Sequence, residues 1–252
     1  MTSGRRRWVA RAAGTVAALV SLAVPASAQR GTLPPQPAIE GLVAAGATLE
    51  PIRGGTLQAD VPVPAEVRGS TFRNQPLRAP GDAIRDRKGG VYFTDQGHST
   101  PEGSYVLYRR PGGDVILIDN EFISPSGLAL SPDEKTLYAV DINAEHVYAF
   151  DVRPDGSVAN RRQFARLEGY TQPATSLPTA GADGITVDAR GRLYVTTNAG
   201  VQVISPSGAN VGTIRVPAKP RNVSFAGAGS RDLLVATAMG VYRISLLTEG
   251  PK

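Results

Sequence analysis

The sequence predicts an all-β protein, and three observations predict it. Short apolar runs of strand length recur between turn residues, and the 252 residues include 28 glycines and 20 prolines. One pattern of strand, turn and strand occurs four times, at residues 80–95, 125–141, 181–198 and 220–237. No long stretch with helical periodicity interrupts this series. An internal repeat of this kind indicates a repetitive β architecture.

The first 28 residues have the pattern of a secretory signal peptide. A basic start, Arg5–Arg7, precedes an apolar stretch from Ala12 to Val24 and the small residues of 26–28. A membrane anchor is the alternative, but it needs about 20 apolar residues. We therefore expect cleavage after Ala28 and export to the periplasm or the medium, by the general route or by the twin-arginine route, whose signal residues 4–9 loosely fit.

The charge of the chain argues against a nucleic-acid partner. The formal net charge is +5, but the first 28 residues hold four arginines and no acidic residue, so the remainder carries only +1. We expect no membrane contact after the signal is removed. The chain has no cysteine, so it has no disulfides and no cysteine-bound metal.

Residues 29–46 are expected to form a flexible leader, because their first part is rich in proline. The segment Ala47–Ile52 can form one strand. Between Gly54 and Pro80, repeated glycine and proline residues leave no hairpin that the sequence predicts.

From residue 80 onward, the first three repeats each continue with a second hairpin, and the fourth continues with one strand. The expected pairs are Tyr105–Arg109 with Val115–Asp119, His146–Val152 with Val158–Leu167, and Val201–Ile204 with Asn210–Val216, whereas the last repeat has only Val241–Ser245. The equivalent residues Asp95, Asp141, Thr197 and Thr237 are 40 to 56 residues apart. A repeat of this length with four strands has the size of a β-propeller blade. The strand at 47–52 can supply the strand that the last blade lacks. A two-sheet sandwich is the alternative, but it does not explain the recurring sequence.

A propeller usually binds its ligand in the central channel, which is lined by the ends of the innermost strands. The residues that precede these strands in the four repeats are Gly81, Ser126, Asp183 and Arg221. Carboxylates repeated at this position could hold Ca²⁺, which prefers several oxygen ligands, but Asp183 is the only one of the four. The alternative for Asp183 is a turn residue that bonds to its own backbone. Asp82 could likewise face the channel or cap its turn.

Other catalytic motifs are missing from the sequence. It contains no G-x-S-x-G nucleophile elbow, no P-loop and no dinucleotide-binding glycine motif, and its two histidines are too few and too separated for a zinc site.

The repeats resemble a known family. The stretches PSGLALSPDEKTLYAVD, FDVRPDGSVANRRQFARLEG, GADGITVDARGRLYVTTNAGVQVISPSG and GTIRVPAKPRNVSFAG are similar to the gluconolactonase/regucalcin (senescence-marker-protein) family, in order, across residues 70–247. The resemblance implies a six-bladed propeller and a metal-dependent lactone hydrolase. It also implies a divalent cation, commonly Ca²⁺, held by a Glu, an Asn and an Asp, and a lactone or sugar-acid-like ligand.

Carried over to this sequence, the resemblance makes Asp183 a metal ligand and the proton acceptor. Ser126 stands where the family has its metal-binding Asn and becomes a weaker ligand. Gly81 stands where the family has a substrate-binding Asn, and Asp82 after it is retained as the substrate-side residue. The early E-G-P element that carries the metal-binding Glu has no match, since Glu66 is followed by Val, Arg and Gly.

The propeller expected over residues 47–247 is one to two blades short of the family's six, so its ring is expected to be incomplete. Three hypotheses follow: an exported lactone hydrolase, a non-catalytic propeller that binds a ligand or a protein, and a degenerate chain without a settled function. The retained Asp183 and Asp82 favour the first, and Ser126, Gly81 and the missing Glu favour the others. The sequence leaves the oligomeric state open.

Overall fold

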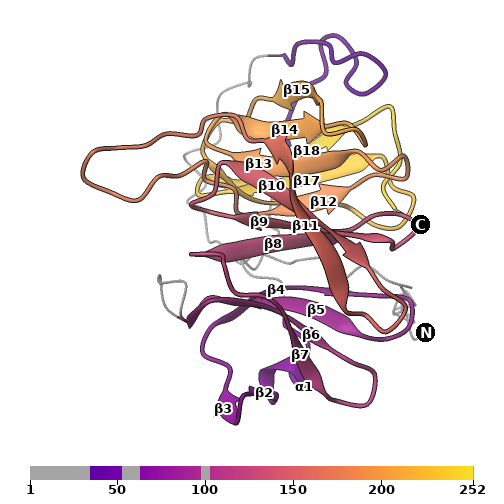
Figure 1. The fold of residues 1–252 in the computed structure, drawn as a ribbon. Helices are drawn as coiled ribbons and strands as arrows, with labels where there is room; N and C mark the ends of the chain where they lie inside the picture. Colours follow the sequence, from indigo (N-terminus) through magenta and orange to yellow (C-terminus); the bar gives the residue numbers. More distant parts are fainter. Residues whose placement is uncertain (1–34, 53–62, 98–102, 252) are drawn as a thin grey trace, which may run out of the picture.

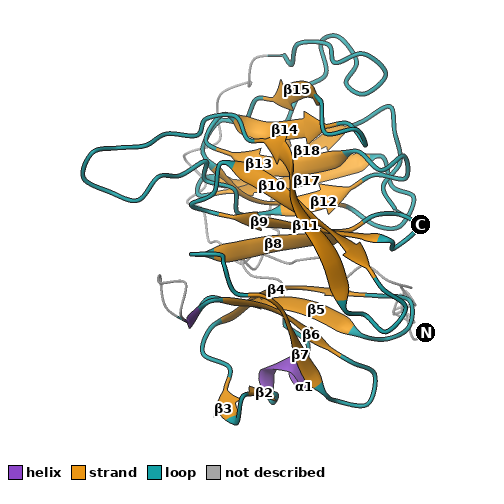
Figure 2. Cartoon of the chain, viewed as in Figure 1, coloured by secondary structure: helices purple, strands orange, loops and turns teal. Residues whose placement is uncertain are grey.

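The computed structural model describes residues 35–52, 63–97 and 103–251. Its β-strands form four sheets of four strands each, arranged as successive propeller blades (Figures 1 and 2). The first blade contains β4 (Pro80–Arg85), β5 (Val91–Asp95), β6 (Tyr105–Arg109) and β7 (Val115–Asp119). The second blade contains β8 (Pro125–Leu130), β9 (Thr136–Asp141), β10 (His146–Val152) and β11 (Val158–Arg166). The third blade contains β12 (Ile185–Val187), β13 (Leu193–Thr197), β14 (Gly200–Ile204) and β15 (Asn210–Ile214), and the fourth contains β16 (Pro220–Phe225), β17 (Asp232–Thr237), β18 (Gly240–Ser245) and β1 (Glu50–Pro51). The predicted all-β propeller with four recognisable blades is confirmed.

The fourth blade takes its last strand from the N-terminal part of the chain. Strand β1 pairs antiparallel with β18, and Glu50 lies opposite Arg243 while Pro51 lies opposite Tyr242. The sequence predicted this closure from the segment 47–52, and the observed strand is only two residues long. A short, charged outer strand limits edge-to-edge pairing with other chains.

Successive blades pack closely because glycine occupies the inner strands where they meet. A methyl group placed on Gly127 of β8 would lie 2.8 Å from the carbonyl oxygen of Asp183 in the third blade. A methyl group on Gly184 would lie 2.8 Å from the Cα of Asn222 in the fourth blade. The backbones of the inner strands therefore touch from the second blade to the fourth, which brings residues of different repeats to one place.

The two ends of the row of blades are covered differently. At the first blade, Val67 of the short helix α1 (Ala65–Arg68) and Val63 just before it are buried against the sheet residues Phe93 and Leu107. A two-stranded ribbon, β2 (Thr71–Phe72) and β3 (Gln75–Pro76), follows, where the sequence predicted no hairpin.

At the fourth blade, the terminal strands carry charged side chains. Arg243 on β18 forms ion pairs with Glu50 on β1 and Asp232 on β17. Within the described ranges, no hydrogen bond or ion pair joins the first blade to the fourth.

Part of the expected leader packs on the core. In the described residues 35–46, the side chains of Ile39, Leu42 and Val43 are buried in the apolar cluster between the third and fourth blades. The proline content predicted a flexible leader. Removing these three apolar side chains from water is favourable, however, and this stabilises the packed conformation of the segment. The signal-peptide prediction at 1–28 lies outside the described residues. In the described part of the chain, no helix is long and apolar enough to cross a membrane.

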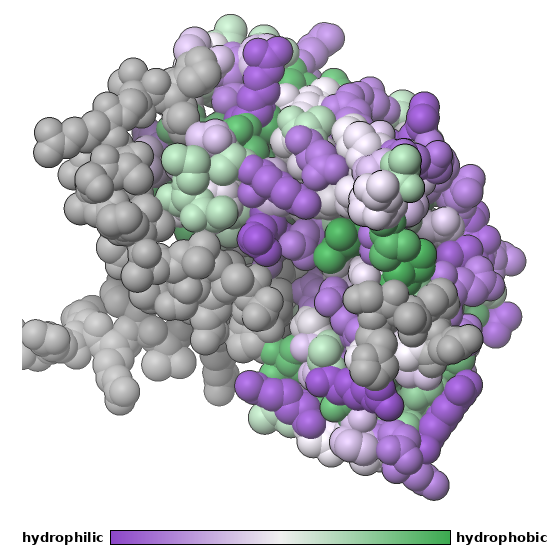
Figure 3. All heavy atoms as spheres, turned by 90° about the vertical axis from the view of Figure 1, so that its left-hand side faces the viewer, coloured by the Kyte–Doolittle hydropathy of each residue, from purple (hydrophilic) through white to green (hydrophobic). Residues whose placement is uncertain are grey.

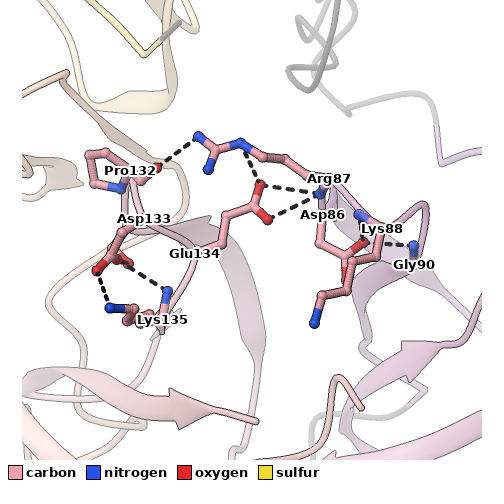
Figure 4. Close-up of polar contacts among 9 residues, drawn as sticks. Asp86, Arg87, Lys88, Gly90, Pro132, Asp133, Glu134 and Lys135 are labelled. Carbon is pink, nitrogen blue, oxygen red and sulfur yellow. Dashed lines mark hydrogen bonds and ion pairs between the residues drawn. The ribbon is translucent and has the colours of Figure 1, made fainter. Parts of the chain in front are cut away.

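A set of polar contacts joins the first two blades at the far ends of their inner strands (Figure 4). The backbone N–H of Arg87 donates to the carboxylate of Glu134, and the Arg87 guanidinium donates to the carbonyl oxygen of Pro132 at 2.8 Å. These turns follow β4 and β8, so the contact lies at the opposite end of those strands from Asp82 and Ser126.

Candidate functional site

The predicted site residues lie where the inner strands begin, and the strands are irregular at that point. The pairing register shifts between Pro80 and Ala83 in the first blade, between Pro125 and Leu128 in the second, and between Pro220 and Asn222 in the fourth. A β-bulge redirects side chains and interrupts the regular ladder, and bulges are common beside active sites. These three blades thus present their first inner-strand residues outside the regular sheet pattern, whereas β12 of the third blade pairs with β13 without a register shift.

The backbone at Asp82 is held by a buried threonine. The backbone N–H of Asp82 donates to Thr94 Oγ1 at 3.0 Å, and that hydroxyl donates to the carbonyl oxygen of Ser126 at 3.2 Å. Thr94 is fully buried on β5. Its single hydroxyl therefore couples the first two inner strands at the site.

The carboxylate of Asp82 reaches across to the second blade. Its Oδ2 atom accepts a hydrogen bond of 2.7 Å from the backbone N–H of Leu128. Burial raises the pKa of Asp82 to about 6, the N–H of Leu128 opposes this rise, and the negative charge of Asp183 adds to it. The two carboxylates of the candidate site therefore interact electrostatically, although they come from the first and third blades.

The backbone at Asp183 is held in the same way as that at Asp82. Thr196 Oγ1, buried on β13, accepts the backbone N–H groups of Asp183 at 3.1 Å and Gly184 at 2.8 Å. Asp183 itself is partly exposed, at the start of the third inner strand. The sequence did not predict Thr94 and Thr196 as supports, but their equivalent places in the two repeats are a signal that could have found them.

Ser126 is buried, and its hydroxyl makes contacts within the fold. Its Oγ donates to the carbonyl oxygen of Ala182 at 2.8 Å and lies 3.3 Å from that of Val140. The hydroxyl thus joins the second blade to the residue before Asp183. Because the hydroxyl acts as the donor in these contacts, only the lone pairs of its oxygen are available to a ligand.

Gly81 and Arg221 are the other two residues that begin inner strands. A methyl group on Gly81 would lie 2.9 Å from Thr94 Oγ1, so a side chain there needs that hydroxyl to shift. Arg221 is exposed, and so is Lys219 two residues before it.

Two further aspartates hold the loops that lead into the inner strands. Asp95 accepts the backbone N–H of Ala79 at 2.7 Å, and Asp141 accepts those of Ile123 and Ser124 at 2.7 and 2.9 Å. Both carboxylates are buried, and burial raises the pKa of Asp141. Their role is to position the segments before the site.

The side of the molecule with these strand starts also carries the longest loop of the described residues, between β11 and β12, which projects to the left in Figure 1. The base of this loop is fixed by paired backbone hydrogen bonds between Thr171 and Thr179 and by the Asn143 amide on the Pro178 carbonyl. Seen from that side, much of the described surface is hydrophilic, with separate apolar patches (Figure 3).

The oxygen ligands at the strand starts are of the kinds that a hard divalent cation binds. Asp183 and Asp82 supply carboxylates and Ser126 a hydroxyl oxygen, which are the ligand types that Ca²⁺ prefers. A cation would also offset the negative charge of Asp183, which adds to the rise in the pKa of Asp82 that burial causes. Among the described residues, however, no three or more His, Asp or Glu side chains gather into a metal cluster. Solvent or substrate would have to complete the coordination.

Comparison with known proteins identifies relatives of this architecture. The family model described as SMP-30/Gluconolactonase/LRE-like region matches residues 57–239, more than half of the chain. A gluconolactonase of Zymomonas mobilis is 28% identical over 195 residues, which are 71% of this chain and 53% of that protein. The lactonase drp35 of Staphylococcus saprophyticus is 33% identical over 143 residues, which are 55% of this chain and 42% of that protein. The chain thus spans about half the length of the curated relatives that it matches.

Solved structures agree with the fold. A gluconolactonase of Xanthomonas campestris is 27% identical and superposes with a TM-score of 0.57, covering 70% of this chain and 60% of that one. Regucalcin, a calcium-binding protein of Agrobacterium tumefaciens, is 16% identical, with a TM-score of 0.57 and coverage of 68% and 62%. The second likeness bears on the fold alone.

Proposed function

Because the chain belongs to the SMP-30/gluconolactonase/LRE-like family, we propose that it is an exported hydrolase of small lactones of the sugar-acid type. The observation that carries the proposal is the placing of Asp82 and Asp183 at the inner-strand starts of the first and third blades, where the negative charge of Asp183 adds to the rise in the pKa of Asp82. The lactonase and gluconolactonase relatives support the substrate class.

In the proposed reaction, Asp183 accepts a proton from a water molecule as the water oxygen attacks the lactone carbonyl carbon. The bond between the carbonyl carbon and the ring oxygen then breaks, the ring oxygen takes up a proton, and the product is the open hydroxy acid. Asp82, whose pKa of about 6 lies near neutrality, can hold or release that proton beside Asp183. Thr94 and Thr196 keep the two backbones in place during the reaction.

A divalent cation, for which we propose Ca²⁺, would be held by Asp183 with the Ser126 oxygen and would polarise the lactone carbonyl. Because Ser126 supplies an uncharged hydroxyl oxygen, we expect weaker binding than a site with several carboxylates would give.

Calcium titration calorimetry and a lactone hydrolysis assay on the mature protein test this proposal together. Asp183→Asn removes the charge with little change in volume, and Asp151→Asn, on β10 of the second blade, is the matched control. We expect saturable calcium binding and lactone turnover in the wild type and the control. Both should fall in Asp183→Asn, with turnover lower by about a hundredfold. A folded wild type that neither binds calcium nor opens a lactone would overturn the proposal.

A propeller that binds a ligand without turnover is the second candidate. It is favoured by Gly81 at a strand start and by the Glu66 carboxylate, which is paired with Arg85 on the first blade and away from the strand starts. Binding of the lactone or its acid without hydrolysis, abolished by Asp183→Asn, would support this function instead.

Export is part of the proposal because of the pattern in residues 1–28. N-terminal sequencing of protein recovered outside the cytoplasm should begin at Gln29. An intact Met1 on cytoplasmic protein would contradict it.

A further inference from the structure

Arg221 stands at the start of β16, at the place that Asp183 holds in the preceding blade. The two strand starts adjoin, since a methyl group on Gly184 would meet the backbone of Asn222 at 2.8 Å. The residues immediately before this contact are Asp183 and Arg221, so a permanent cation lies on the strand next to the proposed base.

Arg221 is exposed and takes no part in the side-chain hydrogen bonds and ion pairs formed among the described residues. Three other strand arginines are paired: Arg85 with Glu66, Arg162 with Asp151, and Arg243 with Glu50. A guanidinium offers five N–H donors in a planar fork that matches a carboxylate. Within the described structure, the fork of Arg221 is therefore available to a ligand.

Lys219 adds a second cation on the same approach. A methyl group on Gly181 would lie 2.9 Å from its Cε atom, so the Lys219 side chain lies along the segment that leads to Asp183. The fourth blade thus contributes positive charge at its strand start, whereas the first and third contribute Asp82 and Asp183.

We propose that Arg221, assisted by Lys219, is an anion subsite that selects lactones carrying an ionised carboxylate away from the ring ester. The proposal rests on the proposed lactone hydrolysis and names its substrate class. Asp82 and Asp183 repel such a carboxylate and Arg221 attracts it, so the substrate binds in one orientation, with its uncharged ester toward Asp183.

The test compares two lactones that differ in one group: glucaro-γ-lactone, which carries the carboxylate, and glucono-γ-lactone, which carries a hydroxymethyl group. Hydrolysis is followed by pH-stat for the wild type, Arg221→Gln, Arg221→Lys and the control Arg190→Gln. Arg190 is an exposed arginine in the turn at the opposite end of the third inner strand.

We expect the wild type to prefer glucaro-γ-lactone. Arg221→Gln should raise the KM for glucaro-γ-lactone, and this fold-increase should be about ten times the fold-increase for glucono-γ-lactone. A tenfold difference corresponds to the loss of one charge-assisted contact. Arg221→Lys should keep part of the preference, and Arg190→Gln should keep all of it. An equal change in KM for both lactones, or no preference in the wild type, would overturn the subsite.

Direct binding separates this inference from the proposed function. If neither lactone is hydrolysed, calorimetry with the glucarate dianion still decides the subsite. Binding that is lost in Arg221→Gln and kept in Arg190→Gln supports the subsite although lactone hydrolysis fails. Absent binding, or equal binding by the wild type and Arg221→Gln, contradicts it.

Discussion

The Oδ2 atom of Asp82 accepts a hydrogen bond of 2.7 Å from the backbone N–H of Leu128, so one carboxylate both belongs to the candidate site and joins two blades. The same holds for Ser126, whose hydroxyl donates to Ala182 just before Asp183. Site chemistry and blade packing therefore use the same side chains, and substitutions there should affect stability and function together.

Asp82→Asn should change how stability depends on pH. The pKa of Asp82 in the fold, about 6, lies above its ordinary value of 3.8, so the folded state binds its proton more tightly than the unfolded state does. The resulting stabilisation is complete below the ordinary pKa and is lost as the pH rises through about 6. The free energy of unfolding of the wild type, from urea denaturation, should fall over this window relative to Asp82→Asn.

Asp151→Asn is the control for that series, because hydrogen bonds from Asn160 and Arg162 lower the pKa of Asp151. Its effect must have the opposite sign: the wild type should gain stability relative to Asp151→Asn as the pH rises through the range of an ordinary carboxyl pKa. Parallel curves for the two variants would contradict the raised pKa of Asp82.

Gly127→Ala should destabilise the protein by about 1–3 kcal/mol, because overpacking forces backbone shifts. The added methyl group would meet the backbone of Asp183 at 2.8 Å and of Ile185 at 2.9 Å. The matched control is Gly227→Ala, since a methyl group at Gly227 has no neighbour within 4 Å. The midpoints of denaturant unfolding measure the stability of both variants. Equal midpoints would show that the inner strands can move apart at Gly127 without loss of stability.

Ser126→Ala should cost about 1–2 kcal/mol of stability, because it leaves the buried carbonyl oxygen of Ala182 without its hydroxyl donor. Ser207→Ala removes a hydroxyl that is exposed and bonded only to Ser205, and it should change stability little. Thermal unfolding of both variants compares them. A Ser126→Ala variant as stable as the wild type would argue that the hydroxyl is not needed for blade packing.

Leu42→Ala should cost about 2–5 kcal/mol, the usual range for a leucine truncated in a core. Leu42 is fully buried between the third and fourth blades, although the sequence placed it in a flexible leader. Leu177→Ala, at a side chain that is 49% exposed, is the control. Similar urea midpoints for the two variants would indicate that the segment 35–46 contributes no core packing.

Most strands could be predicted because each is a local pattern. The β12 segment Ile185–Val187 alternates between two turns, and residues 47–52 contain the strand that completes the last blade. The short helix Ala65–Arg68 and the buried Leu42 were missed, since tertiary contacts with distant strands stabilise them and their own sequence does not favour them.

The sequence by itself determined the repeat, the all-β class and the resemblance that singles out Asp183, because periodicity and turn residues are properties of neighbouring positions. Only the tertiary structure decided that Asp82 responds to the charge of Asp183, that Ser126 is buried, and that Arg221 adjoins the same strand start. These relationships join residues of different blades. Their physical cause is the close approach of inner strands at Gly127 and Gly184, which depends on how whole sheets pack.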